Sequence, residues 1–126
     1  MYLQAQIVYL EVETTWWSLG RRENGVVVEY IRYAVPADRD REFEGAWSEA
    51  EKVLRDAPQC LSYEVARGFE EPENYVVRIE GSSVAEHEQG FRQSPAFQQF
   101  VAAVKPFFEE IQEMRHYEPT AIASGR

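Results

Sequence analysis

The sequence predicts an α+β domain of the ferredoxin-like type, in which the order β-α-β-β-α-β builds a four-stranded antiparallel sheet with its helices on one face. Three observations predict this fold. Stretches rich in β-branched and aromatic residues alternate with stretches whose apolar residues recur every three or four positions. Two of the strand-like stretches are separated by only a short polar turn. Helix-start signals precede both helical parts of the chain.

The first strand and the first helix are expected between residues 26 and 57. Val26 to Val35 is rich in Val and Tyr and stops before a proline, so it predicts a strand. Asp38 or Asp40 is expected to cap the helix, because a short carboxylate accepts hydrogen bonds from the free N–H groups of the first turn. Pro58 should end this helix. The apolar residues of this helix recur every three or four positions and are expected to form one buried stripe along it. Its charged residues are expected to face away from this stripe: Glu44, Glu51, Lys52 and Arg55.

A hairpin follows the first helix. Cys60 to Phe69 alternates as a strand, Glu70 to Asn74 is a polar turn, and Tyr75 to Glu80 predicts the third strand. Gly81 and the two serines after it are expected to break that strand. Ser83 and Glu86 match the capping box S-x-x-E, which predicts a short helix as far as about residue 92.

The last helix and the last strand complete the order. Ser94 and Pro95 suit the cap and the first position of a helix, where the missing N–H of proline costs nothing. Pro106 should kink that helix or end its first segment. Glu113 to Glu118 alternates and predicts the fourth strand. The buried stripe of the helix is expected to hold Phe97, Phe100, Val101, Val104, Phe108 and Ile111.

The predicted strands carry apolar residues at positions that point to both faces of the sheet, as in Val26-Val27-Val28 and Val76-Val77. An antiparallel sheet with one solvated face would instead alternate cleanly between apolar and polar residues. Since the predicted helices cover one face only, we expect a second copy of the chain to cover the other. This would give a homodimer with a barrel-like interior.

Composition limits the class of partner and the compartment. The chain has 126 residues, 13 basic against 22 acidic, and a net charge of −9, so neither nucleic acid nor an anionic membrane is an expected partner. Its single cysteine, Cys60, cannot form an internal disulfide, which suits a reducing compartment. The start of the chain lacks the basic region of a signal peptide, and no apolar run is long enough to span a bilayer. A cytoplasmic location is therefore expected.

The domain is expected to span residues 26–120, followed by a tail at 121–126. Residues 1–25 form an N-terminal extension with two open interpretations. They contain an alternating stretch and an Asn-Gly turn, which would suit an extra edge strand in a hairpin with the first strand. The other interpretation is an appendage outside the domain.

Five segments, in order, resemble the antibiotic biosynthesis monooxygenase (ABM) domain family: V-V-V-E-Y-I-R-Y, P-Q-C-L-S-Y-E-V-A-R, N-Y-V-V-R-I-E, S-V-A-E-H-E-Q-G-F-R-Q-S-P-A-F and M-R-H-Y-E-P-T. The resemblance is closest to a branch whose members are sometimes fused to truncated haemoglobins. It implies a dimeric α/β barrel. Some members of this family oxidise polyaromatic phenols with O₂ and no prosthetic group, while others degrade haem.

Three departures from the family pattern bear on activity. Similar sequences carry a tryptophan where this chain has Gly81. The haem-degrading members use an asparagine on the first strand, which is absent here, and a histidine whose counterpart is Phe91. Haem degradation is therefore disfavoured, and no cofactor is expected. The resemblance implies a cofactor-independent monooxygenase acting on a small aromatic or quinol-like compound. The alternative is a non-catalytic dimeric module that binds a ligand or a partner protein, which Gly81 favours slightly.

His87 and Tyr63 are the candidate catalytic residues. An imidazole that titrates near neutral pH can take the proton of a phenol, and a strand tyrosine can donate a hydrogen bond to a substrate carbonyl. Each residue also has a structural interpretation. His87 would tether the helix that follows the third strand, and Tyr63 would pack as an ordinary residue of the sheet. No metal site is expected, because His87 and His116 lack the spacing of metal ligands.

Four further residues are candidates for substrate binding, each with a plainer alternative. Tyr33 would line a pocket or pack in the sheet, and Arg67 would hold an anionic group or pair with one of the many carboxylates. Phe91 would form a pocket wall or part of the core. His116 would face a ligand or form a dimer contact.

Overall fold

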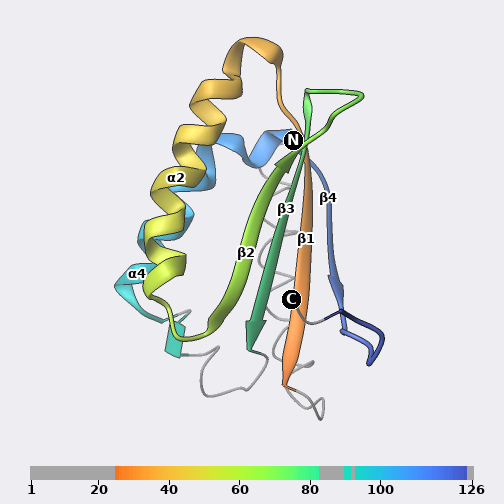
Figure 1. The fold of residues 1–126 in the computed structure, drawn as a ribbon. Coiled ribbons are helices and arrows are strands. Elements are labelled where there is room, and N and C mark those ends of the chain that lie inside the picture. The colour runs from red at the N-terminus through yellow and green to blue at the C-terminus, as the bar shows by residue number, and fades with distance from the viewer. Residues whose placement is uncertain (1–24, 83–89, 92, 125–126) are drawn as a thin grey trace.

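The computed structural model describes residues 25–82, 90–91 and 93–124 (Figure 1). Strand β1 (Val26–Ala34) leads through the 3-10 helix η1 (Ala37–Arg39) into α2 (Asp40–Asp56). Strands β2 (Cys60–Arg67) and β3 (Asn74–Ser82) follow, and then α4 (Pro95–Val104), the 3-10 helix η2 (Lys105–Glu110) and β4 (Ile111–Tyr117). The predictions for residues 1–24, and for the capping box at Ser83 and Glu86, fall outside the described residues.

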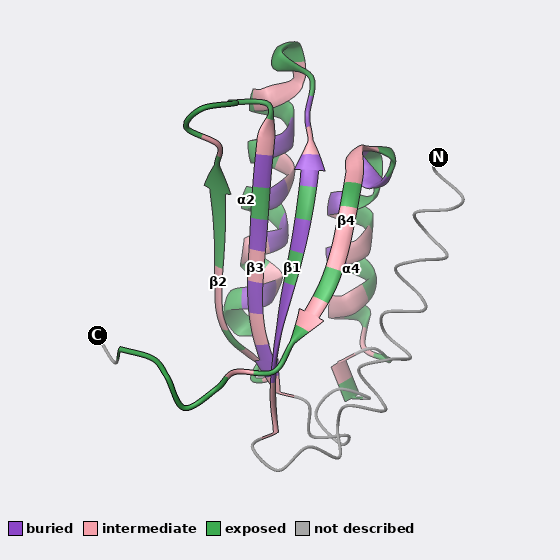
Figure 2. Ribbon diagram, turned by 90° about the vertical axis from the view of Figure 1, so that its right-hand side faces the viewer, coloured by how far each residue is buried: buried purple, intermediate pink, exposed green. Residues whose placement is uncertain are grey.

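The four strands form one antiparallel sheet in the order β2-β3-β1-β4. Helices α2 and α4 lie against the same face of this sheet (Figure 1). The opposite face is turned toward the viewer in Figure 2, with both helices behind it. The predicted ferredoxin-like fold class is thereby confirmed. No helix among the described residues is long and apolar enough to cross a membrane.

Several element boundaries differ from the sequence-based predictions. Strand β2 ends at Arg67 and not at Phe69, and Ile111, expected in the buried stripe of the last helix, begins β4. No aspartate caps α2: Arg39 occupies the N-cap position without a side-chain cap. The reason is that η1 leads directly into α2, so the helical turn has already begun, with Arg39 N donating to Pro36 O at 2.9 Å. Strand β3 also does not break at Gly81 but continues to Ser82, because both residues pair with the start of β1.

The predicted signals at α4 are confirmed. The Oγ of Ser94 accepts a hydrogen bond from Phe97 N at 3.2 Å, and Pro95 occupies the first turn. The α-helix ends at Val104, and the chain continues as η2 around Pro106, as expected where proline cannot donate to the helical ladder.

An aromatic cluster fixes α2 on the sheet. Phe43 is fully buried, and its ring centroid lies 4.8 Å from that of Tyr33, 4.5 Å from that of Tyr75 and 5.2 Å from that of Phe107. Trp47, one turn further along the helix, contacts Phe100 of α4 at 5.6 Å between centroids. Both helices are therefore held to the sheet through one core, which sets the space between α2 and the strands.

Candidate functional site

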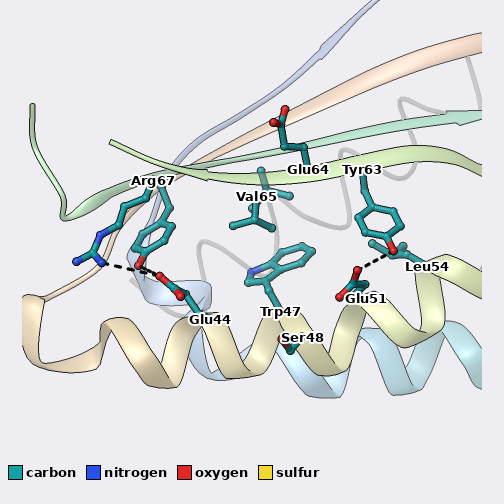
Figure 3. A pocket seen from close by; sticks show the side chains of 11 residues that line it. Glu44, Trp47, Ser48, Glu51, Leu54, Tyr63, Glu64, Val65 and Arg67 are labelled. Carbon is teal, nitrogen blue, oxygen red and sulfur yellow. Dashed lines mark hydrogen bonds and ion pairs between the residues drawn. The ribbon is translucent and has the colours of Figure 1, made fainter. Parts of the chain in front are cut away.

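A cavity of about 420 Å³ lies between α2 and the hairpin β2–β3, on the helix side of the sheet (Figure 3). It runs along β2, which is an edge strand. The helix contributes residues on one side, spaced three and four positions apart so that they share a face. The lining residues are Glu44, Trp47, Ser48, Glu51, Leu54, Tyr63, Glu64, Val65, Arg67, Tyr75 and Val77.

Two hydrogen bonds between a phenol and a carboxylate join the sheet to α2, one toward each end of this cavity (Figure 3). The Tyr63 hydroxyl donates to Glu51 Oε2 at 3.0 Å. The Tyr75 hydroxyl donates to Glu44 Oε2 at 2.5 Å. Burial, helped by the bond to Glu44, raises the pKa of Tyr75 to about 12, so its hydroxyl keeps its proton at neutral pH.

The middle of the cavity is apolar. Figure 3 shows the Trp47 indole rising from α2 between Glu44 and Glu51 toward Val65. The indole is buried, and its N–H makes no hydrogen bond of normal geometry with the described residues. Glu64 points away from the cavity, toward the other side of the sheet (Figure 3). The cavity therefore has two carboxylates at its ends and an aromatic wall between them.

Arg67 lies at the Glu44 end, and its guanidinium already has partners. It donates to Asp40 Oδ2 at 3.1 Å and to Pro72 O at 2.9 Å, and it lies 4.0 Å from Glu44 Oε2. Its guanidinium carbon is also 5.5 Å from the centroid of the Tyr75 ring. These contacts agree with the plainer interpretation of Arg67, in which it pairs with carboxylates of the protein and does not hold an anionic group of a substrate.

The structure brings two of the predicted site residues together, Tyr63 and Arg67, both at this cavity. Tyr33 is fully buried in the core and does not line it, and burial raises the pKa of its hydroxyl well above the usual range. Phe91 lines a separate cavity of about 400 Å³ between the end of α2 and the start of α4. His87 lies outside the described residues.

His116 lies elsewhere, directly opposite Glu29 in the pairing of β4 with β1. Its Nε2 is 3.9 Å from Glu29 Oε2, and each side chain is only 7% exposed. The neighbouring positions Ile31 and Met114 belong to the hydrophobic core or pack against it, so the pair faces the helices. Burial lowers the pKa of His116 to about 4, which leaves the imidazole neutral at neutral pH.

Sequence reasoning missed three carboxylates. Glu44 and Glu51 were expected to face away from the buried stripe, but both reach the sheet, because long side chains beside the stripe can extend to the edge strand. Their spacing of seven residues around Trp47 was a usable signal. Glu29 shares the parity of Ile31 and Tyr33 in an apolar strand, which marked it as a buried charge.

Known proteins resemble this chain in sequence. The family model for antibiotic biosynthesis monooxygenase matches residues 26–103. The uncharacterized protein YczJ of Bacillus subtilis is 23% identical over 79 residues, which cover 63% of this chain and 83% of YczJ.

Two solved structures show the same fold. A protein from Bordetella bronchiseptica, assigned to the antibiotic biosynthesis monooxygenases, is 26% identical with a TM-score of 0.62, covering 76% of this chain and 98% of its own. A variant of SnoaB, a cofactor-independent oxygenase from Streptomyces nogalater, is 16% identical with a TM-score of 0.58, covering 79% and 96%. Since the family model covers more than half of its residues, this chain belongs to the antibiotic biosynthesis monooxygenase family.

Proposed function

We propose that the protein is a monooxygenase that acts on a small aromatic or quinol-like compound without a prosthetic group. The observation that carries the proposal is the cavity along α2, in a chain of this family, with Trp47 as a wall and hydrogen-bonding groups at both ends. A flat phenolic ring fits such a site, because aromatic stacking and burial hold the ring while polar groups orient its hydroxyls.

The chemistry needs only substrate and O₂. Loss of the phenolic proton gives an electron-rich anion that can transfer electrons to O₂. At a CH₂ group conjugated with that ring, the carbon loses two hydrogen atoms and gains one oxygen atom as C=O. The second oxygen atom leaves as water with those hydrogens. The substrate thus supplies all four electrons, and no separate reductant is required.

The direct test is O₂ uptake by the purified protein with a panel of phenols, quinols and anthrone-type compounds, followed by mass spectrometry after reaction under ¹⁸O₂. The proposal predicts one labelled oxygen atom in the product. Uptake that is no faster than the uncatalysed reaction across the whole panel would contradict it.

A non-catalytic module that binds a small aromatic ligand is the second candidate function. One observation favours it: both glutamates that face the cavity already accept a tyrosine hydroxyl. Saturable binding of a phenol with no oxygen uptake would support this second function.

Within the proposed reaction, His87 is the base that removes the phenolic proton. His87→Ala should then lower turnover by about 100-fold, since a positioned general base typically contributes that much. Turnover of the variant and of the unchanged protein would be compared under one set of conditions. Unchanged turnover with a loss of roughly 1–2 kcal/mol in stability would instead make His87 a structural tether.

We also propose that the protein is a homodimer formed through the sheet face opposite the helices. This face carries apolar and aromatic side chains that are partly exposed in the single chain, with Tyr30 at 39%, Val76 at 37% and Tyr117 at 51%. The rings of Tyr30 and Tyr117 pack edge to face at 5.3 Å between centroids. Covering them with a second sheet would remove this apolar surface from water.

Val76→Asp should convert the dimer to a monomer, because it would place an unpaired charge inside the interface. Light scattering at micromolar concentration would measure the mass of both forms. The control is Gln98→Glu, which adds a negative charge at an exposed position of α4 and should leave the dimer intact. An unchanged protein that is a stable monomer of 14.7 kDa would contradict the proposal.

A further inference from the structure

The two glutamates that face the cavity have a defined separation along α2. Glu44 and Glu51 are seven residues apart, which places them on the same side of the helix and separates their backbone positions by about 10 Å along its axis. Trp47 lies between them (Figure 3). The cavity therefore presents two hydrogen-bond acceptors at its ends and an apolar surface between them.

Each of these carboxylates already accepts one phenolic hydroxyl, from Tyr75 and Tyr63 respectively. These contacts show that a phenol can approach each carboxylate with hydrogen-bonding geometry. A carboxylate offers about four lone-pair positions, so each glutamate can accept a further donor without losing its tyrosine.

The charges of the two glutamates are partly balanced on the helix and strand that carry the cavity. Glu44 lies 4.0 Å from Arg67, and Glu51 lies 4.0 Å from Arg55. Arg67 also pairs with Asp40 at 3.1 Å. This partial balance lowers the attraction of the two carboxylates for a cation and leaves their lone pairs available to a neutral hydroxyl donor, while the aromatic wall favours a flat ligand.

We propose that this cavity binds an elongated aromatic diphenol lengthwise along α2, with one hydroxyl donating to Glu44 and the other to Glu51. The proposal deepens the proposed function, since such a compound would be its substrate. The binding itself does not depend on turnover. The ring system would lie against Trp47 and Val65, and the spacing of the two glutamates would select for the length of the ligand.

The test uses a rigid probe, para,para′-biphenol, in calorimetric titrations without oxygen. Its two hydroxyls are separated by about 10 Å, as are the backbone positions of Glu44 and Glu51 along the helix axis. Three relatives serve as comparisons. The ortho,ortho′ isomer has the same groups at the wrong spacing, para-phenylphenol has one hydroxyl, and the para,para′-dimethoxy compound has the length but no donor. The diphenol should bind about ten-fold more tightly than each of them, the difference expected for one hydrogen bond to a charged acceptor.

Substitutions of the two glutamates test each end of the cavity on its own. Glu44→Gln and Glu51→Gln should each weaken binding of the diphenol by about five-fold, because each removes one charged acceptor while keeping the shape of the side chain. The one-hydroxyl probe should lose at most about two-fold in either variant, since it can turn end for end and use the remaining carboxylate. The control is Glu109→Gln, an exposed glutamate that does not line the cavity, and it should leave all affinities unchanged.

Three outcomes would overturn the proposal. The isomers could bind equally, the control could weaken binding as much as the two cavity variants, or a linear eight-carbon diamine could bind more tightly than the diphenol. The last result would assign the cavity to dications. If the diphenol binds as expected but no phenol is oxidised, the binding site stands and the oxygenase proposal fails. If turnover occurs and one of these three binding outcomes is also found, the oxygenase stands and this site fails.

Discussion

Phe43→Ala should lower the free energy of unfolding by about 3–5 kcal/mol, the range for removing a large buried aromatic side chain. Phe43 is fully buried, and its ring packs against aromatic rings from β1, β3 and η2. The substitution would remove these contacts and leave a cavity where α2 meets the sheet. Chemical denaturation, at one fixed protein concentration, would measure the change.

The chain supplies a matched control in Phe69, which is 94% exposed in the turn after β2. Phe69→Ala makes the same chemical change without opening a cavity, so it should alter stability by no more than about 0.5 kcal/mol. If the two substitutions had equal effects, α2 would not be held to the sheet through this aromatic cluster.

Acidification should destabilise the protein through His116. Its pKa is lowered from 6.5 to about 4 in the folded protein, so between these values the unfolded chain binds a proton that the folded chain does not. The contribution of His116 is therefore complete above pH 6.5, falls as the pH is lowered, and reaches a loss of up to about 3 kcal/mol below pH 4. An ion pair of protonated His116 with Glu29, 3.9 Å away, would reduce this loss.

The measurement is the free energy of unfolding at several pH values between 7 and 4, for the unchanged protein and for His116→Gln. Other carboxyl groups titrate at the acidic end of this range, and the variant retains them. The difference between the two proteins therefore isolates His116. The stability of the variant should fall less steeply between pH 6.5 and 4, and parallel curves would show that the buried imidazole does not titrate as its environment predicts.

Local signals in the sequence were sufficient for the order of the elements. Ser94 and Pro95 marked the start of α4 correctly, because a cap hydrogen bond and a proline in the first turn depend only on neighbouring residues. The hairpin of β2 and β3 could also be predicted, since alternation and a polar turn are local properties. From these elements the fold class followed.

The sequence was less informative where backbone hydrogen bonding overrides the preference of a single residue. Gly81 predicts a break, but hydrogen bonding to β1 carries the strand through it. Asp38 and Asp40 predict a cap, but the turn of η1 comes first. In both cases the pairing of backbone groups outweighs the preference of one residue.

The sequence by itself determined the family, the strand and helix order, and Tyr63 and Arg67 as residues worth locating. Only the tertiary structure decided which groups meet at the cavity: Glu44 and Glu51, expected to face away from the helix's buried stripe, each accept a hydrogen bond from a strand tyrosine there. It also separated His116 from that cavity and placed it beside Glu29. The physical reason is that periodicity assigns a residue to a face, whereas the contact between a long side chain and another element depends on how closely the two elements pack.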